Sequence, residues 1–311
     1  MYTYNHRYVG FNSFLLSCFI GSNPLNRFNI SADVGVKIMK VQRKSAIAYL
    51  FRNFWQLVLV SLPAAVLLGF FVTPSDEITF MQSLARGELT LENYFGAYAN
   101  AYSALRLVNN WWVIIISFVL VCFTFSVLIV KIDRHMRVGE MVAFPLKRSF
   151  ALFPLILAYV FIWFLASEIA NFVGIGLMYI FKFINNVGAV VSIGVVSDFM
   201  ANMFVTGLFF RLIITIPLKV SENYRLNIAL SYSARCSAGH KGILWGLTFG
   251  YVWGRYAVMC LGYLLMPFNL DVLVYALAYL FCIAYIPCLS YKLYHDTVGG
   301  ERRDISEIIF Y

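Results

Sequence analysis

The chain has 311 residues, of which 61% are hydrophobic and 13% charged, and its formal net charge at pH 7 is +9. Soluble domains contain about 45–50% apolar and about 25% charged residues, so a soluble fold of this size could not bury so much apolar surface. We therefore expect a membrane protein with lipids as partners. Its basic residues are expected to follow membrane topology, without a nucleic-acid partner.

The first 38 residues stand apart from the rest of the chain. Leu15–Cys18 is similar to a lipoprotein cleavage box, but polar residues interrupt the apolar run before it. A cleaved export signal would also place Arg43 and Lys44 on the wrong side of the membrane, and a translation start at Met39 is the favoured alternative. The predicted division is an N-terminal extension (1–38), a membrane domain (39–291) and a cytoplasmic tail (292–311).

Six stretches of about 20 residues are almost free of charge, which is the length that crosses about 30 Å of hydrocarbon as a helix. The predicted fold class is all-α, a polytopic transmembrane helical bundle. Its spans are expected at about 54–73, 111–130, 152–181, 199–218, 243–266 and 272–291.

Lysine and arginine lie mainly in alternate connections between these spans. The segments before the first span, between the second and third, between the fourth and fifth, and after the sixth hold 19 of them. The other connections hold three. By the positive-inside rule the basic segments are cytoplasmic, so both termini are predicted to lie in the cytoplasm.

Two segments outside the spans are also apolar in part. Residues 74–110 carry a stripe near helical spacing, which predicts an amphipathic helix that covers the bundle or binds an envelope partner. The stripe consists of Leu91, Phe95, Tyr98, Tyr102 and Leu105. Val187–Val196 is too short to span, so it either extends the fourth helix or dips into the outer leaflet. A seventh span is rejected because it would move the C-terminus outside.

Three cytoplasmic segments before odd-numbered spans look alike, at 50–54, 146–150 and, more loosely, 230–233. A mixed apolar and basic stretch precedes each one, which is typical of a short helix on the membrane interface. The pattern predicts three repeats of an interfacial helix plus a transmembrane hairpin. The alternative is that basic segments simply precede every helix that starts inside.

Part of this pattern resembles a known family. Phe51-Arg52-Asn53, Leu57–Leu62 and Thr73–Asp76 are similar to the opening of the YciC-type uncharacterised inner-membrane proteins of Gram-negative bacteria. The resemblance covers about residues 39–291, but the first 38 residues and a longer connection between the third and fourth spans depart from the family. It implies six helices in the bacterial inner membrane and no established activity.

Four glycines form a row at four-residue spacing on the fifth span: Gly242, Gly246, Gly250 and Gly254. Because four residues advance a helix by 400°, the row leaves a shallow groove without side chains. In lipid, such grooves let helix backbones approach closely. We predict that this helix packs closely inside the bundle, with a homo-oligomer contact as the alternative.

Ionisable residues inside spans are costly in lipid and indicate an intramembrane polar centre. Glu168 and Arg255 fall at similar depths, roughly 24 and 18 Å from the cytoplasmic ends of their helices, so we expect them to pair. Asn171 is a further polar partner one turn from Glu168, and Arg211 is shallow enough to snorkel to the cytoplasmic face. The centre either receives a proton, ion or lipid headgroup or fixes helix register.

No motif in the sequence indicates catalysis, a metal site or a cofactor, and the four histidines are isolated. The leading interpretation is a non-enzymatic envelope scaffold or accessory factor that engages lipids, another membrane protein or a second copy of itself. The alternative is a small transporter or channel with a polar centre at Glu168 and Arg255. A lipid-modifying enzyme is disfavoured because no catalytic constellation is found.

Overall fold

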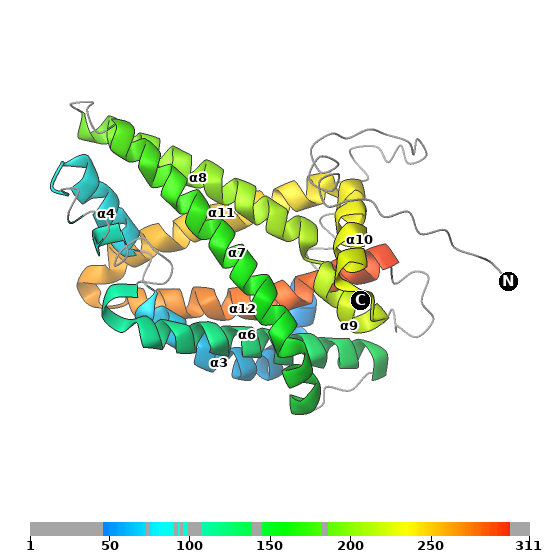
Figure 1. The fold of residues 1–311 in the computed structure, drawn as a ribbon. Helices are drawn as coiled ribbons and strands as arrows, with labels where there is room; N and C mark the ends of the chain where they lie inside the picture. The colour runs from blue at the N-terminus through cyan, green and yellow to red at the C-terminus, as the bar shows by residue number, and fades with distance from the viewer. Residues whose placement is uncertain are drawn as a thin grey trace.

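The computed structural model describes residues 46–72, 75–89, 93, 96–98, 107–138, 145–181 and 186–298. The described chain is all-helical (Figure 1). A short helix at 46–52 leads into α3. The further helices are α3 (Phe54–Phe71), α4 (Ser75–Ala85), α6 (Leu107–Val138), α7 (Leu146–Phe181), α8 (Val187–Leu212), α9 (Thr215–Glu222), α10 (Leu226–Gly239), α11 (Lys241–Leu265), the 3-10 turn η1 (Met266–Phe268) and α12 (Asp271–Val298).

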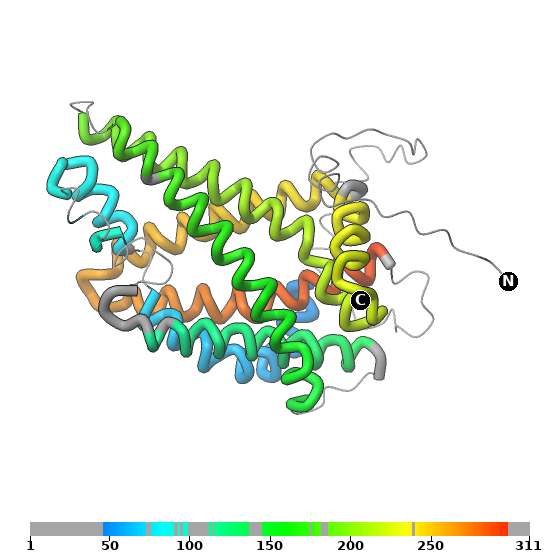
Figure 2. Tube along the Cα trace, viewed as in Figure 1, coloured from blue at the N-terminus to red at the C-terminus, as the bar shows by residue number. Residues whose placement is uncertain are grey.

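Five long helices form a closed ring. Each one packs against the next in the order α6, α7, α8, α11, α12, and α12 packs back on α6. Helix α3 lies outside the ring against α12 and α6, and these three run side by side in Figure 2. Gly69 of α3 permits this close approach, because a Cβ there would lie 2.7 Å from the Cβ of Ala276.

Shorter helices lie at the two ends of the ring (Figure 1). Helix α4 packs on α8, α11 and α7, near the C-terminal end of α7 and the N-terminal end of α8. At the opposite end, α9 packs on α6, α10 and α12. We refer to these ends as the α4 side and the α9 side.

By length and composition, five helical segments of the described chain could cross a membrane: Phe54–Ala85, Ile115–Met136, Leu146–Phe181, Val187–Glu222 and Asp271–Thr297. The protein is therefore a polytopic membrane protein with apolar faces in contact with lipid. Helix α7 contributes much of that surface, with Phe161, Ile162, Leu165, Ile169, Phe172 and Val173 exposed. Helix α11 is 25 residues long but is not one of these five segments.

The fourth predicted span, 199–218, has wrong boundaries. Val187–Val196 forms the first part of α8, which confirms the extension of the fourth helix, and the Asn186 side chain caps it by accepting from the Ala189 N–H. The helix ends at Leu212 instead of Leu218. Pro217 has no N–H for the Ile213 carbonyl and its ring crowds that carbonyl, so the chain turns and restarts as α9.

The predicted threefold repeat stays a prediction. Helix 46–52 and helix α10 precede α3 and α11 as expected, but most of the segment before α7 lies outside the described residues. The extension 1–38, most of the predicted tail and all of the 91–105 stripe except Tyr98 also lie outside them.

Candidate functional site

The α4 side of the ring contains a polar network centred on Arg255 of α11. Its Nη2 forms an ion pair with Glu77 Oε2 of α4 at 2.8 Å. Its Nη1 donates to Asn202 Oδ1 of α8 at 2.6 Å. The two side chains of the ion pair are 26% and 14% exposed, so the charges are held in a partly desolvated setting where their attraction is strengthened.

The network continues along α8 to a fully buried acid. Asp198 is 1% exposed, and its Oδ1 accepts from Asn202 Nδ2 at 3.0 Å. Its second oxygen accepts from the hydroxyl of Tyr256. Asp198 and Asn202 are four residues apart and so share one face of α8, while Arg255 and Tyr256 reach them from α11. The arrangement satisfies a buried carboxylate with two donors, as burial requires.

Helix α4 brings Glu77 to this network through apolar packing. Phe80, Met81 and Leu84 form a buried cluster with Met178 of α7 and Val190 of α8. Glu77 lies one turn before Phe80 and Met81, so the same face of α4 carries the acid and the apolar residues. Docking of this short helix therefore places a carboxylate on Arg255.

Glu77, and not the predicted Glu168, is the acid that the structure shows paired with Arg255. Glu168 accepts from the hydroxyl of Tyr98 at 3.0 Å. The predicted partner Asn171 is buried, and its Oδ1 has no hydrogen-bond partner among the described residues. A Cβ added at Gly174, one turn along α7, would lie 3.6 Å from the Asp198 backbone, so Asn171 lies near the level of the network.

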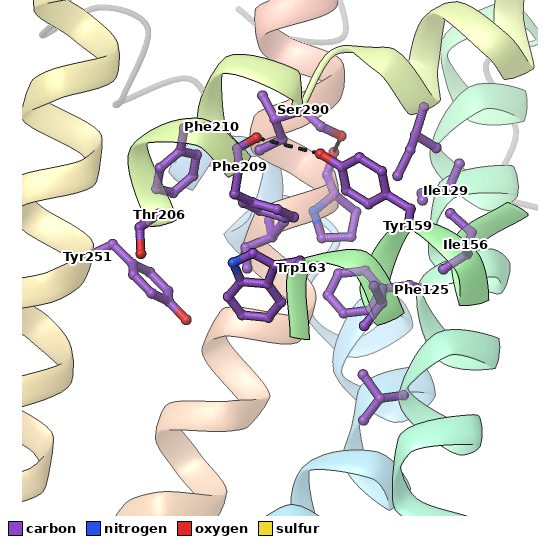
Figure 3. A pocket seen from close by; sticks show the side chains of 16 residues that line it. Phe125, Ile129, Ile156, Tyr159, Trp163, Thr206, Phe209, Phe210, Tyr251 and Ser290 are labelled. Atoms are coloured by element: carbon purple, nitrogen blue, oxygen red, sulfur yellow. Dashed lines mark hydrogen bonds between the residues drawn. The ribbon is translucent and has the colours of Figure 1, made fainter. Parts of the chain in front are cut away.

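A cavity of about 90 Å³ lies inside the ring (Figure 3). All five ring helices and α9 line it, mainly with apolar and aromatic side chains. Tyr159 and Trp163 of α7 pack on Phe209 of α8, with ring centroids 5.6 and 5.0 Å apart. Trp163 Nε1 is buried, and within the described chain it has no hydrogen-bond partner. The cavity thus offers an apolar space with an unsatisfied donor in its wall.

The cavity and the α4-side network are adjacent. Thr206 and Tyr251 line the cavity and lie one helical turn below Asn202 and Arg255, a distance of about 6 Å. A molecule that extended from the network along the ring axis would therefore enter the cavity.

A second polar network closes the α9 side. Asp133 of α6 is 1% exposed, and its Oδ1 accepts from the Ser221 hydroxyl of α9 at 2.7 Å. Arg148 of α7 lies 3.3 Å from its other oxygen. The hydroxyl of Tyr294 of α12 donates to Glu222, also on α9. These contacts fix α9 across the end of the ring.

More buried polar groups surround this α9-side network. Tyr49 is hydrogen-bonded to His135 Nδ1 at 2.8 Å, and burial raises the pKa of the Tyr49 hydroxyl. Lys292 forms an ion pair with Asp296 one turn away. His135, which was expected to be isolated, therefore has a hydrogen-bond partner. Lys131 is also buried, at 5% exposure.

Arg211 lies at the α9-side end of α8, as its sequence position suggested. Its backbone carbonyl accepts from the hydroxyls of Ser233 and Ser237 of α10 at 3.0 and 2.5 Å. Carbonyls at a helix C-terminus lack partners within the helix, so these serines cap α8 and dock α10 on it. Sequence reasoning noted the charge of Arg211 and missed this role of its backbone.

The glycine row does not pack inside the bundle as predicted. A Cβ added at Gly242, Gly250 or Gly254 would meet nothing within 4 Å, and all three glycines are exposed. Gly246 is intermediate in burial. Beside the row, Trp245, Phe249 and Trp253 are each more than half exposed. This face of α11 thus presents an aromatic ridge next to a shallow glycine groove.

The chain was compared with protein-family models, with curated proteins and with solved structures, and none of the three comparisons finds a match. Within the described residues, no group of three or more His, Cys, Asp or Glu side chains could hold a metal ion.

Proposed function

We propose that the protein crosses the bacterial inner membrane six times, with α11 as the fifth span in chain order and both termini in the cytoplasm. Helix α11 packs between α8 and α12, and its 25 residues cover about 37 Å. The α9 side is then cytoplasmic, in agreement with the positive-inside rule. Labelling of single cysteines near 140 and 235 from the same face would support this topology, and labelling from opposite faces would overturn it.

We further propose that the protein is a small transporter-type protein that takes up an amphipathic solute inside its ring. The observation that carries this proposal is an apolar cavity at the centre of five helices, with a polar network at each end. Packed interiors rarely leave voids, and an apolar void is a place for an apolar group. The expected scaffold role requires no such cavity, so the geometry favours the transporter alternative.

Accessibility of the cavity tests this proposal. A Thr206→Cys variant, in a background without native cysteines, places a thiol in the cavity wall. A small membrane-impermeant thiosulfonate added to proteoliposomes should modify it from each face in turn, because a carrier opens to both. Leu208→Cys on the same helix is the control, since Leu208 is 38% exposed on the outer surface of the bundle and should stay unmodified. A Thr206→Cys thiol that no reagent reaches from either face would contradict transport.

Self-association is a second candidate role, favoured by the exposed face of α11. The glycine groove and the aromatic ridge lie next to each other, so two copies related by a twofold axis could place each ridge in the other's groove. This role would fit the expected envelope scaffold. Gly250→Leu should abolish cross-linking between copies in native membranes, whereas Ala158→Leu on the exposed face of α7 should not. Equal cross-linking in both variants would exclude this contact.

A role without catalysis and the resemblance to YciC-type proteins stay predictions. Turnover of radiolabelled lipids by the purified protein would overturn the first of them.

A further inference from the structure

We infer that Arg255 is the binding site for the acidic head of the solute, and that Glu77 takes this place when the site is empty. This inference rests on the proposed function, because it assigns the solute's class: an anionic, single-chain amphiphile. Its head would lie on the guanidinium and its chain in the cavity.

Arg255 is suited to this role by its position. In the described part of the ring helices, it is the sole lysine or arginine in the halves that face the α4 side. Among the described residues of the ring helices, Arg255 is thus the cation that an anion entering from this side meets. Arginine also matches the geometry of carboxylate and phosphate oxygens, which form short charge-assisted hydrogen bonds with it.

Two contacts of Arg255 come from different parts of the fold. Asn202 belongs to α8, a ring helix, so its bond to Nη1 at 2.6 Å orients the guanidinium permanently. Glu77 belongs to α4, which is an 11-residue helix outside the ring. Undocking of α4 would remove the carboxylate from Nη2 and leave the ring and the Asn202 contact intact. The carboxylate position is thus the exchangeable one.

The cavity determines the direction and the size of the solute's hydrocarbon chain. Tyr251 lines the cavity one helical turn below Arg255, and the lining further along is apolar: Phe125, Ile129, Ile156, Phe209, Phe210, Ile213 and Ile216. A volume of about 90 Å³ is smaller than the roughly 150 Å³ apolar cavity that accepts benzene. A space of this size accommodates the end of one hydrocarbon chain.

Glu77 acts in this arrangement as a tethered competitor. A carboxylate that is part of the protein binds the same nitrogen as the incoming head, so the two cannot occupy it together. Neutralising Glu77 should then strengthen binding of an anionic amphiphile, whereas loss of a purely structural ion pair would weaken the site or leave it unchanged.

The test uses photoreactive single-chain probes with a diazirine near the chain end, on the purified full-length protein in lipid nanodiscs. The probes are a fatty acid, a monoalkyl phosphate and the matching fatty alcohol. For wild type, we expect the acid or the phosphate to label cavity peptides around 156–163 and 206–216 more strongly than the alcohol. Whichever acidic probe gives the larger excess identifies the head as carboxylate or phosphate.

Variants then separate the two proposals. Glu77→Gln should raise labelling by the acidic probe about tenfold, and Glu88→Gln, which changes an exposed acid just after α4, should not. Arg255→Gln should make acid and alcohol equivalent. Val160→Trp, which fills the cavity, should block all probes, whereas Ile162→Trp on the exposed face should not. Cavity labelling that ignores the head and Glu77 would overturn this inference and keep the proposed function. Absence of cavity labelling by every probe would overturn both.

Discussion

The two polar networks at the ends of the cavity are built differently. On the α9 side, Asp133 is 1% exposed and bonds to Ser221 of a helix that follows α8 after a two-residue turn. On the α4 side, Arg255 and Glu77 are 26% and 14% exposed, and Glu77 belongs to α4. The α9-side network is therefore the more deeply buried of the two, and its contacts are the harder to break. Under the proposed function, this comparison assigns the opening of the ring to the α4 side.

Packing around the short helices agrees with this difference. All residues from Ile213 to Leu218, in the turn and the start of α9, are buried, and α10 is docked on the end of α8 by two serine hydroxyls. Helix α4 buries three large apolar side chains in a smaller cluster. Release of α4 would therefore expose fewer buried side chains than release of α9.

The largest effect is expected from Asp133→Ala. The substitution removes a buried carboxylate and leaves the Ser221 hydroxyl without this acceptor, which should lower the free energy of unfolding by about 2–3 kcal/mol. Denaturation with sodium dodecyl sulfate in mixed micelles measures this change. Lys147→Ala is the control, because Lys147 is exposed at the start of α7 and should contribute less than about 1 kcal/mol. Equal effects of the two variants would show that Asp133 is not a buried closure.

A smaller loss is expected from Tyr294→Phe. Tyr294 is fully buried, and its hydroxyl donates to Glu222, so its removal should cost about 1–2 kcal/mol in the same assay. Tyr263→Phe on α11 is the matched change at a residue that is 37% exposed, and should alter stability by less than about 0.5 kcal/mol. A Tyr294→Phe protein as stable as wild type would weaken the claim that α9 is firmly held.

Glu77→Gln should reduce global stability by no more than about 1 kcal/mol, because its ion pair is partly exposed. The effect should be local instead: amide hydrogen exchange in α4 should accelerate by roughly fivefold, since about 1 kcal/mol corresponds to that ratio. Exchange in α9 should not change. Glu88→Gln serves as the control. If Glu77→Gln lowered the free energy of unfolding as much as Asp133→Ala does, the two ends would not differ in the way proposed.

The sequence predicts helix starts well where flanking charged residues and the length of the apolar stretch both limit the span. The predicted starts of the first, fifth and sixth spans fall within two residues of α3, α11 and α12. It failed for α8, because 187–222 is one nearly continuous apolar run and hydropathy does not tell which part spans. Two signals were available: Pro217, which breaks a helix at Ile213, and Asn186, which is a good N-cap.

The site was predicted in part. Arg255 stood out because a cation inside a span is rare. Its partner was chosen by comparing depths in the membrane, and this comparison considers only acids within spans. Glu77 lies in a connection that was expected to cover the outer surface, so it was not considered. Asp198 was missed because α8 was expected to begin at residue 199, so its four-residue spacing to Asn202 was not considered. The cavity could not be predicted, since it depends on how side chains from five helices pack.

The smallest effect is expected from Gly250→Ala, which tests whether the outer face of α11 is independent of both networks. The added Cβ meets no atom within 4 Å, so stability should change by less than about 0.5 kcal/mol. Gly69→Ala makes the same chemical change where the Cβ would lie 2.9 Å from the Ala276 backbone, and it should destabilise the fold by about 1–3 kcal/mol. If both variants lost equal stability, the α11 face would be covered in the folded protein. The two ends would then have to be compared in an assembly in which α11 is covered, and not in a monomeric ring that opens at α4.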